Sequence, residues 1–564
     1  MIAITKNLET DVLIVGGGIA GLNAAIAARE GGAEVIVAEK ANTLRSGSGA
    51  TGNDHFLCYI PEKHGPDPHV VLNEIRNSMV WQGQDVPLTM RFLEESFSVV
   101  QRWHSWGINM RLFNDWTFLG HAFPGRPRIF LKFEGQNQKP ILTREAKKAG
   151  AKILNHHVVL DLIKNDTGIA GALAMDVSGK EPTFTIIRAK CVMLAAGCGN
   201  RLYTSANTPG SMFNTGLCPS CTAAAPAQAW RIGATLVNME TPVRVAGSKY
   251  FTRCGKATWI GVYRYPDGRP LGPFVTKPTR ELGDITGDIW NLAFTELMQN
   301  GNGPVYMDCS QTSKEDLTFM RSAMASEGLT SLVNYMDEHG IDPSKSGVEF
   351  AQFETQLMGC NGIQIDINGE SSIPGLYAAG DCTGNFRADI AGAAVYGWIG
   401  GRHAATQVHN RVLMSAERAE NDSWVKNRIA YYSSFYDRKE GAGWIEANKG
   451  VQQIMSDYAP AGPTKVRSES LLRAGLDYLA KLRTYTEAEL SAPDAHTLMR
   501  SVEVFDLMDC AAIVMRAARE RKETRGLHRR SDYTFTNPLL NDKLQTIRQE
   551  NGEVISEWRT RLEA

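Results

Sequence analysis

The chain has 564 residues, and its 60 lysines and arginines nearly balance its 61 aspartates and glutamates, giving a net charge of −1. No overall field therefore favours nucleic acid or an anionic membrane, and a charged partner must be met by a local patch. The length predicts about two to four domains. No stretch reaches the roughly eighteen uninterrupted apolar residues of a membrane span, and the first residues lack a signal-peptide core, so we expect a cytoplasmic chain without membrane insertion.

A glycine-rich turn follows the first apolar run. Val12–Val15 is wholly apolar, as expected of a parallel strand that is buried on both faces. Gly16, Gly18 and Gly21 then match the G-x-G-x-x-G spacing. In that motif the first glycine allows a tight turn, the second lets the backbone approach a pyrophosphate, and the third lets a helix pack on the strand. Alone, the spacing is a weak signal.

The residues after the turn complete a dinucleotide-binding pattern. Ala20–Ala28 predicts a small-residue helix whose N-terminal amides face the pyrophosphate. Glu34–Ala38 predicts a second buried strand, and Glu39 at its end can accept hydrogen bonds from both hydroxyls of a ribose. Residues 43–53, rich in glycine and hydroxyl side chains, are expected to wrap the pyrophosphate and the edge of a flavin. Strand, glycines, helix, strand and acid together predict a dinucleotide site.

The dinucleotide domain is predicted to be discontinuous. Its further elements are predicted as helices at residues 68–112 and strands at residues 152–163, 169–176, 183–187 and 190–197. Far downstream, Gly375–Asp381 repeats the pattern of a buried strand that ends in Ala-Ala-Gly, and it closes with Gly-Asp. These returns bracket an insertion. The domain therefore comprises residues 1–230 and 350–410.

The insertion and the C-terminal part differ in composition. Residues 231–350 are rich in arginine, proline, glycine and aromatic residues, as in a mobile cap over a flavin, and include a predicted helix at Ile289–Met298. Residues 411–564 are mostly amphipathic helix, including a long helix that Pro493-Asp494 opens and that runs to about Arg519. The basic segment after it is either a solvated helix end or a docking patch for an acidic partner.

These elements predict an α/β protein. It combines a two-dinucleotide-type, Rossmann-like FAD-binding domain with an inserted α+β capping domain and a C-terminal helical domain. Its ten cysteines do not indicate a disulfide framework in a chain of this length. Cys218 and Cys221 form a C-x-x-C pair, but no second close pair accompanies them, so we expect neither a metal site nor an iron–sulfur cluster of the chain's own. Small buried cysteines near the flavin are the favoured interpretation, and a redox-active disulfide remains open.

Motifs along nearly the whole chain resemble one group of flavoproteins. They occur in family order at Gly16–Glu39, Arg45–Gly49, Ala195–Gly197, Pro278–Glu281, Gly303–Asp308, Gly375–Asp381 and Thr524–Tyr533. This order is similar to that of the flavoprotein subunits of succinate dehydrogenase and fumarate reductase. Within that superfamily the chain looks closest to the alpha subunit of dissimilatory adenylylsulfate reductase, through Asn238–Arg244, His339–Pro343 and Leu357–Gly359. The resemblance is more specific for the superfamily than for the substrate.

The resemblance implies an FAD cofactor and the residues that bind it. They are Gly16, Gly18, Ala20, Gly21, Glu39, Lys40, Ser46, Gly47, Ser48, Thr51, Gly52, Val159, Ala196, Gly197, Gly380, Asp381, Val395 and Gly397. Succinate-oxidising members attach FAD through a histidine in Arg-Ser-His-Thr. Gly47 stands at that position, so we expect FAD to be bound non-covalently.

Further departures from the family pattern concern the substrate. The family's His-Pro-Thr motif falls near Val245–Gly247, which lacks both His and Thr, and its substrate-clamping arginine aligns with Val395. Each charge-assisted bond to a buried carboxylate is worth about 1.5–3 kcal/mol, so succinate and fumarate become poor candidates. The histidine expected for adenylylsulfate is replaced near Cys360-Asn361, which disfavours that substrate as well.

Arg280 and Arg244 are the candidate catalytic residues. In fumarate reductases the arginine that matches Arg280 delivers a proton while the flavin delivers hydride, and a fixed guanidinium also stabilises developing negative charge. An interdomain salt bridge is the alternative for Arg280. Arg244 resembles the substrate-anion arginine of the sulfur enzyme, with a surface or structural role as its alternative.

Three functions follow from these expectations. The first is an FAD oxidoreductase subunit that exchanges electrons between a small substrate and a separate iron–sulfur, ferredoxin-like subunit. The second is a self-contained reductase of an unsaturated acid, and the third is a non-catalytic electron-transfer flavoprotein in a larger complex. A homodimer or a heterotetramer is compatible with each of them.

Overall fold

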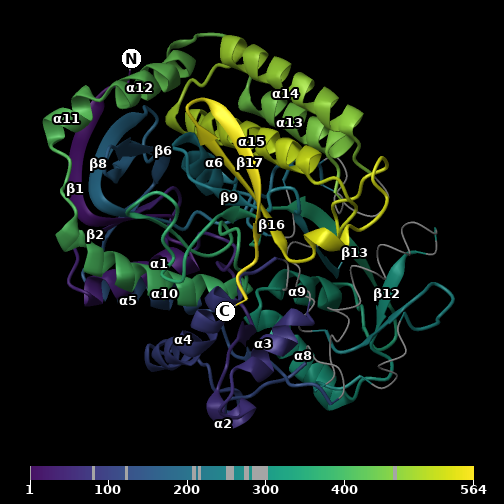
Figure 1. Ribbon diagram of the computed structural model, residues 1–564. Coiled ribbons are helices and arrows are strands. Elements are labelled where there is room, and N and C mark those ends of the chain that lie inside the picture. The colour runs from purple at the N-terminus through teal and green to yellow at the C-terminus, as the bar shows by residue number, and fades with distance from the viewer. Residues whose placement is uncertain are drawn as a thin grey trace.

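The computed structural model describes residues 2–563, except for residues 79–82, 121–124, 206–210, 214–216, 249–258, 272–277, 282–300, 302, 358 and 462–465. The predicted helix at Ile289–Met298 lies outside the described residues. Figure 1 shows the chain from its purple N-terminal strand to its yellow C-terminal strands.

A mixed sheet forms the centre of the fold, and its strand β1 leads directly into the glycine-rich turn. Its strands run in the order β5-β2-β1-β8-β7-β6, and β15 pairs with β8. Their bounds are β1 Ile4–Val15, β2 Val35–Glu39, β5 Lys152–Asn155, β6 His157–Asn165, β7 Gly168–Asp176, β8 Thr183–Leu194 and β15 Leu376–Ala378. Pairing is parallel among β5, β2, β1, β8 and β15 and antiparallel for β7 with its two neighbours. The carboxyl ends of β1, β8 and β15 therefore meet at one edge, where α/β folds bind their ligands.

Strand β8 differs from the sequence prediction in one respect. Residues 183–187 and 190–197 were expected to form two strands, and the structure joins them into the single strand Thr183–Leu194. Its first half pairs with β7 while its apolar second half pairs with β15, and β1 pairs along nearly all of it. Continuous pairing with β1 holds the two halves in one line.

Helices cover the sheet, and two of them pack unusually closely. The helices before the cap are α1 Ile19–Glu30, α2 Pro61–His64, α3 His69–Arg76, α4 Val86–Ser105, α5 Gln138–Lys148 and α6 Ala224–Arg231. Helix α1 lies against α10 (Asp389–Gln407). Side chains at Gly397 and Gly401 would collide with the carbonyl oxygens of Ala20 and Ala24, so these glycines allow the two backbones to approach. A small antiparallel pair, β3 (His55–Leu57) and β4 (Phe130–Lys132), lies apart from the main sheet.

The inserted segment has its own sheet and its own hydrophobic core. The antiparallel strands run in the order β10-β13-β12-β11, with bounds β10 Val243–Ser248, β11 Val262–Arg264, β12 Val305–Asp308 and β13 Val348–Gln356. Helices α8 (Lys314–Ser326) and α9 (Thr330–Glu338) contribute Met320 and Met336 to a buried cluster that also holds Trp259 and Phe350. This segment, called the cap below, lies at one side of the molecule in Figure 1.

The C-terminal part contains the predicted helices and an unpredicted β-hairpin. The helices are α11 Ala416–Asn421, α12 Ser423–Asp437, α13 Trp444–Tyr458, α14 Glu469–Glu489 and α15 Ala495–Glu520. Asp494 caps α15 and forms a capping box with Thr497, as the Pro-Asp start predicted. Strands β16 (Lys543–Glu550) and β17 (Glu553–Thr560) then form a hairpin that joins β9 (Leu236–Val237) and β14 (Gly362–Ile363) in a third sheet. The hairpin thus ties the chain's end to the segment that follows α6.

Two arginines of the basic segment after α15 are buried instead of solvated. Arg521 lies 2.7 Å from a carboxylate oxygen of Glu240 and 2.7 Å from one of Glu523, and all three side chains are buried. Arg530 is also buried and pairs with Asp532 at 2.7 Å. Neither predicted role applies to Arg521 and Arg530, because both guanidinium groups are used inside the fold.

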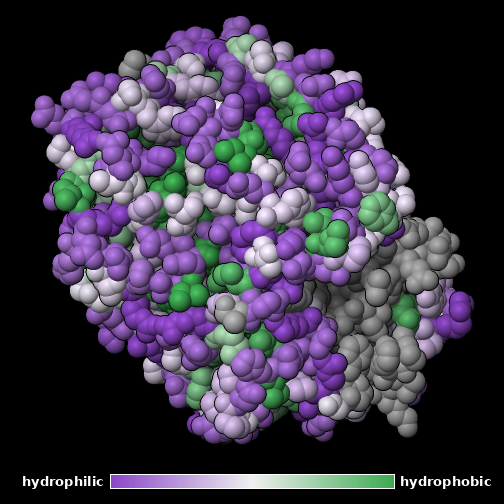
Figure 2. Space-filling model, viewed as in Figure 1, coloured by the Kyte–Doolittle hydropathy of each residue, from purple (hydrophilic) through white to green (hydrophobic). Residues whose placement is uncertain are grey.

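The surface in Figure 2 is mostly polar, and its apolar residues occur in small separate groups. Within the described part of the chain, every helix is too short or too polar to cross a bilayer.

Candidate active site

The turn after β1 has the geometry that the glycine spacing predicted. Gly16 adopts a φ of +99°, and a side chain there would press on the carbonyl of Ala195, 2.6 Å from its oxygen. A side chain at Gly21 would collide with the Gly16 carbonyl oxygen. At Gly18 the space is open, since a Cβ there would lie 3.9 Å from its nearest neighbour. A phosphate can therefore approach the backbone at this point.

Helix α1 presents unpaired amides to the same space. Its first turn holds no acidic residue, and no side chain caps its N-terminus at Gly18. Gly18, Ile19 and Ala20 all line one cavity of about 400 Å³. Free amides and the positive end of the helix dipole suit the pyrophosphate of FAD.

Glu39 is fixed at the carboxyl end of β2. One carboxylate oxygen accepts a hydrogen bond from the Gly17 amide at 2.7 Å, and the other accepts one from the Ala41 amide at 2.8 Å. Each oxygen keeps a second lone pair for a ribose hydroxyl. Sequence reasoning missed Lys139, whose buried ammonium donates to the Gly17 carbonyl. Burial lowers the pKa of Lys139 to about 8, against the opposite pull of Glu39.

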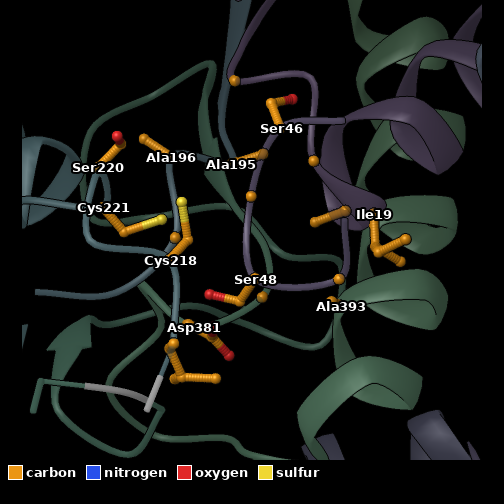
Figure 3. A pocket seen from close by; sticks show the side chains of 18 of the residues that line it. Ile19, Ser46, Ser48, Ala195, Ala196, Cys218, Ser220, Cys221, Asp381 and Ala393 are labelled. Carbon is orange, nitrogen blue, oxygen red and sulfur yellow. The ribbon is translucent and has the colours of Figure 1, made fainter. Parts of the chain in front are cut away.

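Most residues expected to bind the cofactor lie around this cavity, and Figure 3 shows part of its wall. The expected residues that line it are Gly16, Gly18, Ala20, Glu39, Lys40, Ser46, Gly47, Ser48, Val159, Ala196, Gly197, Gly380 and Asp381. The walls of the cavity thus include the glycine-rich turn, the carboxylate of Glu39, which can bind a ribose, and Asp381 near the end of β15. This donor and acceptor set fits a dinucleotide.

The other expected cofactor residues do not line the cavity. Gly21 and Gly397 occupy close backbone approaches, as described above. Val395 is fully buried in α10. At Gly52, with a φ of +129°, a side chain would collide with the carbonyl oxygen of Ser326 at the end of α8, and Thr51 lies beside Gly328. Thr51 and Gly52 therefore contact the cap.

Lys40 joins the cavity to the C-terminal helices. Its ammonium lies 2.6 Å from Glu503 of α15 and also donates to the Ser220 carbonyl. Glu503 lies 2.7 Å from Arg201 and 2.9 Å from Arg500 as well. Burial opposes the charge on Glu503, but these cations lower its pKa from 4.5 to about 2.

A histidine–carboxylate pair stands where the cavity meets the cap. His55 and Glu327 line the cavity, and Glu327 belongs to the cap. Nδ1 of His55 lies 2.7 Å from one oxygen of buried Asp54, and the ammonium of buried Lys132 lies 2.7 Å from the other. Although burial opposes ionisation, Lys132 and His55 hold the pKa of Asp54 well below its usual range. The site residues 54 and 55 directly follow the glycine-rich loop, and that adjacency was the one signal for them in the sequence.

A second charged group lines the cavity near Asp381. Nε of Arg387 donates to Asp389 at 2.9 Å, and its buried Nη1 has no hydrogen-bond partner among the groups that the structure describes. Burial and the charge of Asp389 raise the pKa of Asp381 to about 6, while Arg387 opposes that rise. Arg387 was not singled out from the sequence, because the family arginine aligns with Val395.

Of the two arginines expected to be catalytic, Arg280 lies away from the cavity, and the side chain of Arg244 lies outside the described part of the structure. Arg280 pairs with Asp316 at 2.5 Å and with Glu315 at 2.7 Å, and its guanidinium lies 5.1 Å from the ring centre of Phe319. These partners all belong to α8, and Arg280 does not line the cavity. Arg244 lies in β10, where its backbone pairs with Thr355. Their catalytic roles remain predictions.

Two family profiles match the chain. The profile of the FAD binding domain matches residues 11–393, and the profile described as fumarate reductase flavoprotein C-term matches residues 448–554. The chain belongs to the fumarate reductase flavoprotein family. It is an FAD-dependent oxidoreductase of this family, as the motif order predicted.

Individual relatives are similar to this chain over nearly its whole length. The chain is 25% identical to one subunit of the fumarate reductase (CoM/CoB) from Methanothermobacter marburgensis, across 95% of this chain and 98% of the relative. It is 23% identical to an L-aspartate oxidase from Streptomyces coelicolor, across 93% and 89%. The structure of adenylylsulfate reductase from Archaeoglobus fulgidus superposes with a TM-score of 0.83 at 21% identity, covering 100% of this chain and 97% of that chain. At that identity the superposition supports the fold alone.

Proposed function

We propose that this flavoprotein exchanges electrons between a small anionic substrate and a separate iron–sulfur, ferredoxin-like protein. FAD supplies the redox chemistry when it is bound. In this proposal the chain's own residues bind the anion, orient it and hold or release a proton. The observation that carries the proposal is the buried guanidinium of Arg387 in the cavity wall.

Arg387 supplies a positive charge in place of the family's arginine, whose position is occupied by Val395 in this chain. A buried donor without a partner costs about 1–3 kcal/mol, and an anionic oxygen would satisfy Nη1 of Arg387. Val395 cannot bind an anion, but Arg387 precedes it on the segment that leads into α10. A single guanidinium suits a small anion better than a dicarboxylate that needs clamping at both ends.

His55 is the group in this proposal that handles the proton. Its Nδ1 contact with Asp54 fixes the orientation of the ring, as in other histidine–carboxylate pairs. The ring packs edge-on against Phe130, which also lines the cavity, with centroids 5.6 Å apart. A proton donor or acceptor is thereby held at the end of the cavity where the FAD-binding fold meets the cap.

The anion site can be tested by titrating FAD-loaded protein with sulfur oxyanions and unsaturated acids while recording the flavin spectrum. Losing a charge-assisted bond of about 1.5–3 kcal/mol should weaken binding of the responding anion about 10- to 150-fold in Arg387→Gln. Arg280→Gln is the matched control, because Arg280 already has two carboxylate partners. Weakened binding in Arg280→Gln with unchanged binding in Arg387→Gln would overturn the assignment.

The iron–sulfur partner is supported by the names of the relatives and by the cysteine pattern. The Methanothermobacter relative is named as one subunit of its enzyme. Among the described residues, the cysteines do not form a set of four ligands of the kind that holds a cluster. An anaerobic pull-down from the native host should recover iron and acid-labile sulfide with the tagged chain. Full turnover with a small reductant and no iron–sulfur protein would instead support the self-contained reductase.

A further inference from the structure

Two cysteines on the cavity wall sit in one tight turn. The Cys221 amide donates to the Cys218 carbonyl at 3.1 Å, and Asn200 braces the turn through bonds to both carbonyls, at 2.6 Å and 2.9 Å. Such a turn brings the Cα atoms of its first and last residues within about 7 Å of each other. Disulfides join Cα atoms that are about 4.4–6.8 Å apart. The backbone is therefore already close to the geometry of a Cys218–Cys221 disulfide.

The thiols of this turn contact each other. Cys218 and Cys221 are hydrogen-bonded through their side chains, and Cys221 is also hydrogen-bonded to Cys198. Figure 3 shows the sulfurs of Cys218 and Cys221 directed toward one another on the cavity wall. Cys198 in turn lies 3.8 Å from the hydroxyl of Ser48. The sulfurs of Cys218, Cys221 and Cys198 therefore form a row of contacts that reaches Ser48, beside the space that fits FAD.

We propose that Cys218 and Cys221 are a redox-active dithiol that exchanges two electrons with FAD bound in the same cavity. In the oxidising direction the two S–H bonds break and one S–S bond forms. The two electrons and two protons pass to FAD, which becomes FADH₂, so no other oxidant is needed. In the reverse direction FADH₂ reopens the disulfide. The proposal requires only that FAD binds, and it is independent of the substrate assigned above.

The surroundings distinguish this pair from the other described cysteines. Cys58, Cys191, Cys382 and Cys510 are buried, and their sulfurs bond to a serine hydroxyl or to backbone carbonyls. The Cys218–Cys221 turn instead lines the cavity and carries the Lys40 ammonium on its Ser220 carbonyl. Hydrogen bonding to a neighbouring thiol and burial raise the pKa of Cys218 and of Cys221 well above the usual value, against the opposite pull of Lys40, so the reduced pair carries two S–H groups.

A metal ion fits this cluster poorly. In the described part of the chain, the one group of potential ligands that converge within 4.8 Å is Asp54, His55 and Glu327, and the cysteines are not part of it. A structural zinc site would need four ligands. The sulfurs instead contact one another in pairs, which suits the formation of a disulfide between two neighbouring cysteines.

The test counts electrons and thiols in the FAD-loaded protein. Anaerobic reductive titration should consume four electrons per chain in the wild type and two in C218S/C221S. After oxidation with ferricyanide and denaturing alkylation, the wild type should lack two alkyl groups, and peptide mapping should find residues 218 and 221 joined. Cys58→Ser, outside the cavity wall, should still take up four electrons.

Two results would overturn the proposal. One is a wild-type titration that ends at two electrons, and the other is full alkylation of both thiols after oxidation. Thiol counting on the wild type needs no variant, so a misfolded C218S/C221S protein would not block the test. Either result leaves the anion site at Arg387 unaffected, because that site is measured through the flavin spectrum.

Discussion

Nδ1 of His55 lies 2.7 Å from a carboxylate oxygen of Asp54, on the wall of the cavity that fits FAD and that Glu327 of the cap also lines. The carboxylate is buried and its pKa is held well below the usual range, so it orients the imidazole as a charged partner. A histidine held in this way can give or take a proton without first reorganising.

Removing the imidazole should slow the reaction without releasing FAD. General acid–base catalysis contributes about 10²–10⁴ in rate, so His55→Gln should lower the turnover number by that factor. Single-turnover flavin reduction or reoxidation by the responding substrate measures the effect. His69→Gln is the matched control, because His69 also lies 2.7 Å from a carboxylate, that of Asp67, but is exposed outside the cavity. Equal losses in both variants would contradict the assignment.

Truncating Glu39 should weaken FAD binding. Its carboxylate is expected to receive ribose hydroxyls, and charge-assisted bonds of about 1.5–3 kcal/mol predict a 10- to 150-fold rise in the dissociation constant of FAD in Glu39→Ala. Fluorescence of FAD released on dilution measures this. Glu34→Ala, which removes an exposed carboxylate just before the same strand, should retain wild-type affinity.

Glu503 should be important for stability. Removing its charge leaves Lys40 and Arg201 without their shared carboxylate, and breaking a buried ion pair costs about 3–5 kcal/mol. Glu503→Gln should lower the free energy of unfolding by that amount in urea denaturation. Glu520→Gln, an exposed change on the same helix, should stay within about 0.5 kcal/mol of the wild type.

The contribution of Glu503 should depend on pH in a defined direction. Its pKa is lowered from 4.5 to about 2, so the folded state keeps the carboxylate charged where the unfolded chain binds a proton. The stabilisation is therefore complete above pH 4.5 and is lost as the pH falls toward 2. The difference in unfolding free energy between wild type and Glu503→Gln should shrink across that window. A difference that grows as the pH falls would contradict the assigned ion pairs.

The close approach of α1 and α10 should not tolerate a side chain. Gly397→Ala places a Cβ against the Ala20 carbonyl oxygen, and overpacking of this kind costs about 1–3 kcal/mol. Thermal unfolding of the FAD-loaded protein measures the loss. Gly179→Ala is the control, because the nearest atom to its Cβ would be 4.0 Å away.

The sequence indicated those parts of the site that depend on local pattern. The apolar run at Val12–Val15, the glycine spacing and Glu39 each lie within one strand–turn–helix–strand unit, so their geometry follows from neighbouring residues. The start of α15 at Asp494 was predictable for the same reason.

The features that the sequence did not reveal depend on distant contacts. Lys139 reaches Gly17 across the fold, Lys132 reaches Asp54 from another strand, and Glu503 meets Lys40 from the C-terminal helices. No local periodicity marks such residues. The hairpin β16–β17 is different, because Asn551-Gly552, both with positive φ, forms the two-residue turn between its strands and was a local signal that the sequence analysis overlooked.

The central claim is that this cavity brings a small anion into redox contact with non-covalently bound FAD. Anaerobic spectral titration of the purified protein tests it most directly, with sulfur oxyanions, unsaturated acids and reduced ferredoxin as reactants. We predict that acid releases all the FAD, that one class of anion changes the flavin's oxidation state, and that reduced ferredoxin also does so. A colourless protein that takes up no FAD, or a bound flavin that no anion affects, would contradict the account.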